Sequence, residues 1–134
     1  MRKAYFAISY ANRKLFDNIV ERLENLLKKY DIELFIFVDK YNFKSNQEKE
    51  MMETAFNEID SSDFLIAELT TKSIGVGIEI GYAFAKNKPI YYIYKNGSEY
   101  STTASGSSNY IIEYKDELDL IETMKERLKL TAKI

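Results

Sequence analysis

Short apolar runs alternate along the chain with longer segments in which apolar residues recur every three or four positions. The short runs predict β-strands, and apolar residues at successive positions are typical of strands covered on both faces. The longer segments predict amphipathic helices. The expected strands are residues 3–8, 33–38, 63–69, 90–94 and 110–114. The expected helices are residues 12–30, a segment opened by residues 45–48 and buried through Met51, Met52, Ala55, Phe56 and Ile59, residues 77–86 and residues 116–130.

Local signals mark several boundaries of these elements. Ser45 and Glu48 have the spacing of a capping box, which predicts the start of the second helix. Pro89 forbids continuation of the third helix. Residues 95–108 are rich in Gly, Ser and Thr and are expected to form a long loop.

Strands that alternate with helices predict right-handed crossovers and a parallel sheet covered on both faces. Five strands favour a flavodoxin-like α/β fold with strand order 2-1-3-4-5, in which ligands bind at the carboxyl ends of the strands. No repeat, low-complexity tract or proline-rich linker interrupts the chain, so residues 1–134 are expected to form one domain.

The amino-acid composition limits the kinds of reaction and of binding partner that the chain can have. The chain has 134 residues, a net charge of −2, and neither cysteine nor histidine. The charge gives no general attraction to nucleic acid or to anionic membranes, and no apolar run approaches the length of a membrane span. The missing residue types exclude disulfides, thiolate nucleophiles, the Ser-His-Asp triad and the usual zinc ligands. We therefore expect a cytoplasmic protein without metal or cofactor, whose chemistry rests on carboxylates, hydroxyls, Lys, Arg or backbone groups.

A glycine-rich segment at residues 73–81 follows a predicted strand and opens a predicted helix. Gly75 and Gly77 let a ligand approach the backbone, although their spacing matches neither the dinucleotide fingerprint nor the Walker loop. Glu79 is expected in the first helical turn, where the helix dipole favours the ionised carboxylate. Such a carboxylate at the sheet edge is a candidate nucleophile, and the alternative is a solvated surface glutamate.

Residues 67–83, followed by Lys88-Pro89-Ile90, resemble the nucleoside 2-deoxyribosyltransferase superfamily, and within it the 2′-deoxynucleoside 5′-phosphate N-hydrolases. The resemblance extends to residues 5–9, 63–67 and 97–106. It implies cleavage, by hydrolysis or transfer, of the N-glycosidic bond of a 2′-deoxynucleoside or its 5′-monophosphate. It also implies that Glu79 attacks C1′ of the deoxyribose and forms a glycosyl-enzyme intermediate.

The same resemblance implies a substrate pocket containing Tyr5, Ser9 and Ser73. It further implies a homodimer in which the Ser101 loop completes the active site of the neighbouring subunit. Tyr41, with Asn42 and Phe43, follows a predicted strand and is a candidate for contact with the base. The alternative is that these side chains pack only against their own loop.

Two features depart from the family pattern. The position of the second catalytic aspartate of the family is Ala55 here. A general acid or base must then come from elsewhere, and the candidates are Asp39 and Asp60, which otherwise cap turns. The segment Ser9 to Arg13 lacks the glycine pair and early arginine of the N-hydrolases, so a requirement for a 5′-phosphate stays open.

Two other functions remain as alternatives. Residues 6–10 resemble the first strand of TIR domains, some of which cleave NAD through a glutamate. A non-catalytic nucleotide-binding module would account for Ala55. Release of free base from deoxynucleosides, from NAD or from neither would separate the three.

Overall fold

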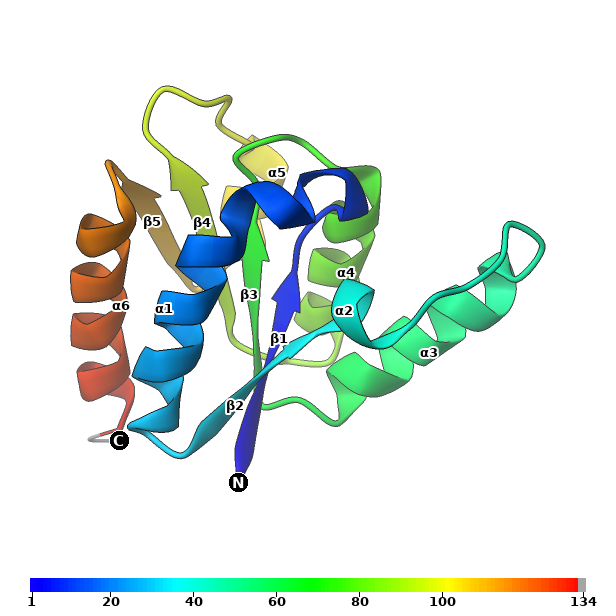
Figure 1. The fold of residues 1–134 in the computed structure, drawn as a ribbon, viewed down its shortest axis with the longest axis horizontal. Helices are drawn as coiled ribbons and strands as arrows, with labels where there is room; N and C mark the ends of the chain where they lie inside the picture. The colour runs from blue at the N-terminus through cyan, green and yellow to red at the C-terminus, as the bar shows by residue number, and fades with distance from the viewer. Residues whose placement is uncertain (133–134) are drawn as a thin grey trace.

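The computed structural model describes residues 1–132, which form one five-stranded parallel sheet with helices on both faces (Figure 1). The strand order is β2-β1-β3-β4-β5, and this confirms the predicted flavodoxin-like topology. The strands are β1 (Arg2–Ala7), β2 (Ile32–Ile36), β3 (Phe64–Glu68), β4 (Ile90–Lys95) and β5 (Tyr110–Tyr114).

Two pairs of helices cover the sheet (Figure 1). α1 (Asp17–Lys28) and α6 (Glu117–Ala132) pack together on one face, and α3 (Glu48–Asp60) and α4 (Ile74–Ala85) pack together on the other. Shorter helices at the carboxyl edge or in the connections are η1 (Tyr10–Phe16), α2 (Phe37–Lys40) and α5 (Thr102–Gly106). No helix within residues 1–132 is long and apolar enough to cross a membrane.

Alternation along the strands divides the core into two layers. Phe6 points into the cluster that contains Leu23 of α1 and Met124 of α6. Its neighbour Tyr5 points into the other cluster, which contains Ile80 of α4. Because successive strand residues face opposite sides of the sheet, a strand between two helical layers must be apolar at nearly every position.

Several predicted boundaries are wrong. β2 ends at Ile36, and residues 37–40 turn into the short helix α2 instead of continuing the strand. The predicted loop at residues 95–108 contains α5. The helix predicted from residue 12 begins as the 3₁₀-helix η1 and becomes α-helical only at Asp17.

The starts of two helices also differ from the prediction, and helix capping explains both differences. The predicted capping box does not form, because Gln47 occupies the N-cap position of α3 and its side chain accepts the Lys44 backbone N–H at 2.9 Å. α4 begins at Ile74, three residues earlier than predicted, because the Ser73 hydroxyl accepts the Val76 N–H at 3.3 Å. This cap satisfies one of the unpaired amides of the first turn and lengthens the helix toward the sheet edge.

Candidate active site

A cavity of about 540 Å³ opens at the carboxyl edge of the sheet, beside the point where the strand order reverses between β1 and β3. Its wall is formed by the end of β1, by α2 and the segment that follows it, by one side of α3 and by the first turns of α4. Most of the lining side chains are apolar. Glu79 is the only carboxylate in this wall among the described residues.

Glu79 lies in the second turn of α4, and the hydroxyl of Tyr5 on β1 donates a hydrogen bond to its carboxylate. Burial raises the pKa of Glu79 to about 7, and the hydrogen bond from Tyr5 opposes part of this rise. The expectation that Glu79 lies in the first helical turn is wrong, because α4 begins at Ile74. The helix dipole acts mainly on the first turn, and at Glu79 desolvation is the larger influence on the pKa. A carboxylate with this pKa changes its charge in the neutral range.

Tyr5 holds this carboxylate from the interior of the protein. Its side chain is fully buried, and burial together with the negative charge of Glu79 raises its pKa well above the ordinary range. The phenol therefore stays protonated and acts as a hydrogen-bond donor at every physiological pH. Tyr5 holds one carboxylate oxygen, Oε2, of a glutamate that lines the cavity.

Small polar groups lie near Glu79 in the same wall. The Ser9 hydroxyl is buried and has no hydrogen-bond partner within the described residues. Ser73 caps α4, and the N–H groups of Ile74 and Gly75 have no acceptor within the helix. A side chain at Gly75 would meet no atom closer than 3.9 Å, so packing within the protein does not require glycine there. This corner can accept a polar or anionic part of a ligand.

Three aromatic side chains also line the cavity, and we call them the aromatic wall: Phe37, Tyr41 and Phe43. The ring centroids lie 5.0 Å apart for Phe37 and Tyr41, 5.7 Å for Tyr41 and Phe43, and 6.1 Å for Phe37 and Phe43. The rings thus pack on one another and also line the cavity. A planar ligand has a matching surface here.

Sequence reasoning missed part of this lining. Phe37 was placed in a strand, although it is the first residue of α2. The apolar stripe of α3 predicts burial of Met51 and Met52, yet both are half-buried and line the cavity together with Ala55. Their apolar spacing is the same for a core face and a cavity face, so no signal in the chain separates the two roles.

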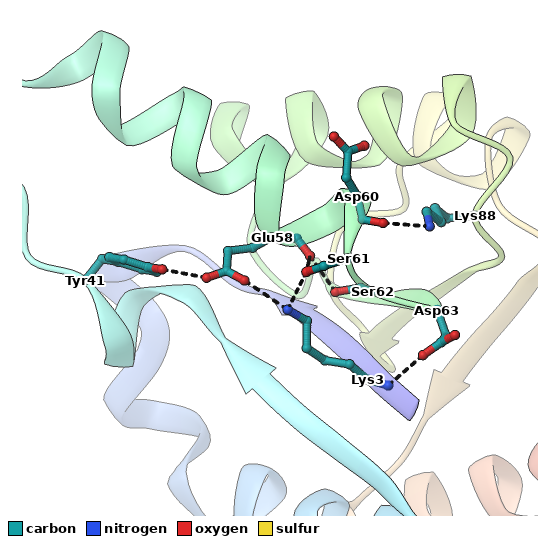
Figure 2. Close-up of polar contacts among 8 residues, drawn as sticks. All are labelled: Lys3, Tyr41, Glu58, Asp60, Ser61, Ser62, Asp63 and Lys88. Atoms are coloured by element: carbon teal, nitrogen blue, oxygen red, sulfur yellow. Dashed lines mark hydrogen bonds and ion pairs between the residues drawn. The ribbon is translucent and has the colours of Figure 1, made fainter. Parts of the chain in front are cut away.

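The structure does not bring Asp39 and Asp60 to the cavity wall. Both oxygens of Asp39 accept hydrogen bonds from the Arg13 guanidinium, at 2.9 and 2.8 Å. The carboxylate of Asp60 accepts the Tyr82 hydroxyl at 2.9 Å. Its backbone carbonyl accepts the Lys88 ammonium at 3.0 Å (Figure 2). Asp60 ends α3 just before β3, which places it at the amino end of that strand.

Gly77 and Ser101 line a separate hollow of about 360 Å³ between α4 and α5, which shares only Ser73 with the main cavity. The Ser101 hydroxyl accepts the Ala104 N–H at 3.1 Å and so caps α5. Within one chain, therefore, Ser101 does not face Glu79.

A second buried carboxylate, Glu68, ends β3 outside the cavity wall. It accepts hydrogen bonds from the Thr70 N–H at 2.7 Å, the Thr70 hydroxyl at 2.6 Å and the Tyr114 hydroxyl at 2.7 Å. Burial raises its pKa although these hydrogen bonds oppose the change. Glu68 is fully engaged in joining the ends of β3 and β5. Within residues 1–132, no group of His, Cys, Asp and Glu side chains could hold a metal ion.

Comparison with known proteins identifies the family of the chain. The family model described as nucleoside 2-deoxyribosyltransferase matches residues 4–127. A Syntrophotalea carbinolica protein, provisionally named 2′-deoxynucleoside 5′-phosphate N-hydrolase 1, is 38% identical over 76 residues. The match covers 54% of this chain and 54% of that protein, so the chain spans about half the length of this relative. The 5-hydroxymethyl-dUMP N-hydrolase of Branchiostoma floridae is 35% identical over 75 residues, 52% of this chain and 71% of that one.

A solved structure shares the fold. The CMP N-glycosidase of Clostridium botulinum superposes with a TM-score of 0.71 at 21% identity, over 94% of this chain and 99% of that chain. At this level of identity the likeness concerns the arrangement of strands and helices alone.

Proposed function

The chain belongs to the nucleoside 2-deoxyribosyltransferase family, and from this we propose that it cleaves the N-glycosidic bond of a 2′-deoxynucleoside or its 5′-monophosphate with Glu79 as the nucleophile. The observation that carries the proposal is the position of Glu79. It is the only carboxylate in the wall of the main cavity among the described residues, and Tyr5 orients it.

Two steps account for the reaction. A carboxylate oxygen of Glu79 forms a bond to C1′ as the C1′–N bond breaks, and the electron pair of that bond leaves with the base. The transition state resembles an oxocarbenium ion, which a nearby carboxylate stabilises. In hydrolysis, water then attacks C1′ as the C1′–O bond to Glu79 breaks, which releases the sugar, restores the free carboxylate and gives one proton to solvent. In transfer, a second base attacks C1′ instead, and a new nucleoside is released.

The departing base must take up a proton, and the cavity wall offers no second carboxylate for this purpose. Ala55 is apolar, and Asp39 and Asp60 are engaged with Arg13 and Tyr82 outside the wall. We therefore infer that the proton comes from water in the open cavity. Bases that are good leaving groups should then react fastest, because they need the least help from an acid.

The polar corner of Ser9, Ser73 and the first amides of α4 is the candidate site for the sugar and for a 5′-phosphate. No lysine or arginine side chain lines the cavity among the described residues. The nearby guanidinium of Arg13 is neutralised by Asp39 and by Asp17, whose Oδ1 lies 2.8 Å from Nη1. Any phosphate would be held by neutral donors and the helix terminus.

We expect purified protein to release free base from at least one member of a panel of deoxynucleosides and their 5′-monophosphates, monitored by HPLC. Ribonucleotides and NAD are the comparison substrates, because release from NAD alone would favour TIR-like chemistry. Binding without release from any member would favour a nucleotide-binding module, for which Ala55 in the cavity wall is the supporting observation. Either outcome would contradict the proposed reaction.

We also propose a homodimer whose interface includes the outer face of α4. This face is apolar and exposed, with 86% exposure at Ile74, 47% at Ile78 and 61% at Phe84, and it borders the hollow that contains Ser101. A second copy seated there would bury the apolar side chains and bring its own Ser101 loop near the first turn of α4.

Sedimentation is expected to show a dimer at assay concentrations, and Ile78→Arg is expected to shift the protein toward monomer with loss of activity. Leu118→Arg is the matched control, because Leu118 is 63% exposed on α6, remote from α4. A monomeric wild type with full activity would contradict this prediction.

A further inference from the structure

The phenol of Tyr41 is hydrogen-bonded to one member of a charged pair, Glu58 and Lys3, neither of which lines the cavity (Figure 2). Its hydroxyl donates to Glu58 Oε2 of α3 at 2.5 Å. The other carboxylate oxygen, Oε1, accepts the ammonium of Lys3 on β1 at 2.9 Å. The same ammonium donates to the Ser61 hydroxyl at 2.7 Å, so three elements of the fold meet around Glu58.

We call the ion pair of Glu58 and Lys3 the anchor of Tyr41, and further contacts hold it in place. The Lys3 and Glu58 side chains are only 16% and 19% exposed, so solvent screens their interaction less than it screens a surface ion pair. The Lys3 backbone N–H donates to Asp63 at 2.7 Å, and its ammonium lies 4.6 Å from the centre of the Phe35 ring. Burial by itself would raise the pKa of Glu58, but the hydrogen bonds from Tyr41 and Lys3 lower it, so this acceptor is ionised at neutral pH.

The anchored tyrosine is the middle member of the aromatic wall. Its ring contacts both Phe37 and Phe43, and the centroid of Phe37 lies 6.4 Å from that of Tyr5, the residue that orients Glu79. Tyr41 follows the single turn of α2 and begins a connection without helix or strand until α3. Its backbone N–H bonds back to Phe37 at 3.1 Å, the ring packs against its aromatic neighbours, and Glu58 holds the hydroxyl at the outer end of the phenol.

We propose that Glu58 and Lys3 are positioning residues, which hold Tyr41 and thereby fix the aromatic wall in the orientation that stacks on the base of the substrate. The proposal rests on the proposed function for the identity of the ligand. A wall held before binding spares the ligand the cost of ordering the side chains. Loss of the anchor should therefore weaken binding, while the hydrogen bond between Tyr5 and Glu79 stays in place and keeps its chemistry.

The test compares Tyr41→Phe, Glu58→Met and the double variant. Phe keeps the ring, and Met nearly keeps the side-chain volume but has no oxygen that could accept the phenol. We expect each single variant to raise KM about tenfold, the scale of one lost hydrogen bond to a charged group, and to leave kcat within about twofold. The double variant should match the single ones, because both remove the same contact. Lys3→Met should behave similarly, and Lys3→Arg should keep the wild-type KM.

Tyr82→Phe is the matched control, since its hydroxyl also donates to a carboxylate of α3, Asp60, but Tyr82 does not line the cavity. We expect its KM to equal that of the wild type. A purely structural role would lower the melting temperature in Tyr41→Phe and Tyr82→Phe alike without a selective change in KM, and this result would overturn the proposal.

Calorimetric titration of the same variants with the panel of deoxynucleosides and 5′-monophosphates separates this proposal from the catalytic one. A tenfold weaker affinity in Tyr41→Phe, in a protein that releases no base, would uphold the positioning role and refute the N-glycosidase. Equal affinities in Tyr41→Phe and the wild type, or no binding by the wild type, would refute the positioning role.

Discussion

Glu79→Gln is expected to slow release of the base at least about a thousandfold and to leave substrate affinity within a fewfold of the wild type. The substitution keeps the shape of the side chain and its contact with Tyr5 but removes the oxygen that captures C1′. Because this oxygen bonds to C1′ only as the reaction proceeds, its loss lowers kcat far more than it weakens ground-state binding. Single-turnover HPLC assays and calorimetric titration measure the two quantities separately.

The control is Glu53→Gln, which alters an exposed glutamate of α3 that does not line the cavity and should keep wild-type rates. Turnover that survives in Glu79→Gln would contradict the assignment and would direct attention to Asp39 and Asp60. If the wild type itself releases no base and the substitution changes only affinity, the protein is a binding module.

The rate of base release is expected to decrease as the pH is lowered. The decrease should begin near pH 7, which is high for a reaction that depends on a glutamate. Burial raises the pKa of Glu79 to about 7, and only the ionised carboxylate can attack C1′. Well below that pKa, kcat/KM should decrease about tenfold for each pH unit, which puts the rate at pH 5 roughly a hundredfold below its level at high pH. Above it, the carboxylate is ionised and the rate should be level. An exposed glutamate would stay ionised over the whole of this interval.

Tyr5→Phe tests the direction in which the Tyr5 hydrogen bond shifts the pKa of Glu79. The hydrogen bond from Tyr5 lowers the pKa of Glu79, so its removal should move the inflection to still higher pH. Circular dichroism at each pH shows whether the protein stays folded. A profile that is flat between pH 5 and 7 would contradict either the nucleophilic role of Glu79 or the burial that raises its pKa.

Local patterns in the chain were sufficient for the fold and for the location of the cavity. Apolar runs place β1 and β3 correctly to within two residues at each end, and alternation with helices dictates a parallel sheet. Parallel strands present their carboxyl ends at one edge, so Ser9, Ser73 and Glu79 were expected to converge, and all three line the same cavity. These features depend on neighbours in sequence or on general rules of topology.

The protonation of Glu79 and the state of its neighbours depend instead on contacts that are remote along the chain. Tyr5 meets Glu79 across 74 positions, and Lys3 meets Glu58 across 55. The sequence predicts Asp39 as a candidate general acid or base, yet in the folded protein both of its carboxylate oxygens accept hydrogen bonds from Arg13. Desolvation and pairing are set by whatever the fold packs around a charge, and no local pattern encodes that surrounding. For this reason the motif identified the candidate nucleophile, whereas folding determined its pKa and the anchoring of the aromatic wall.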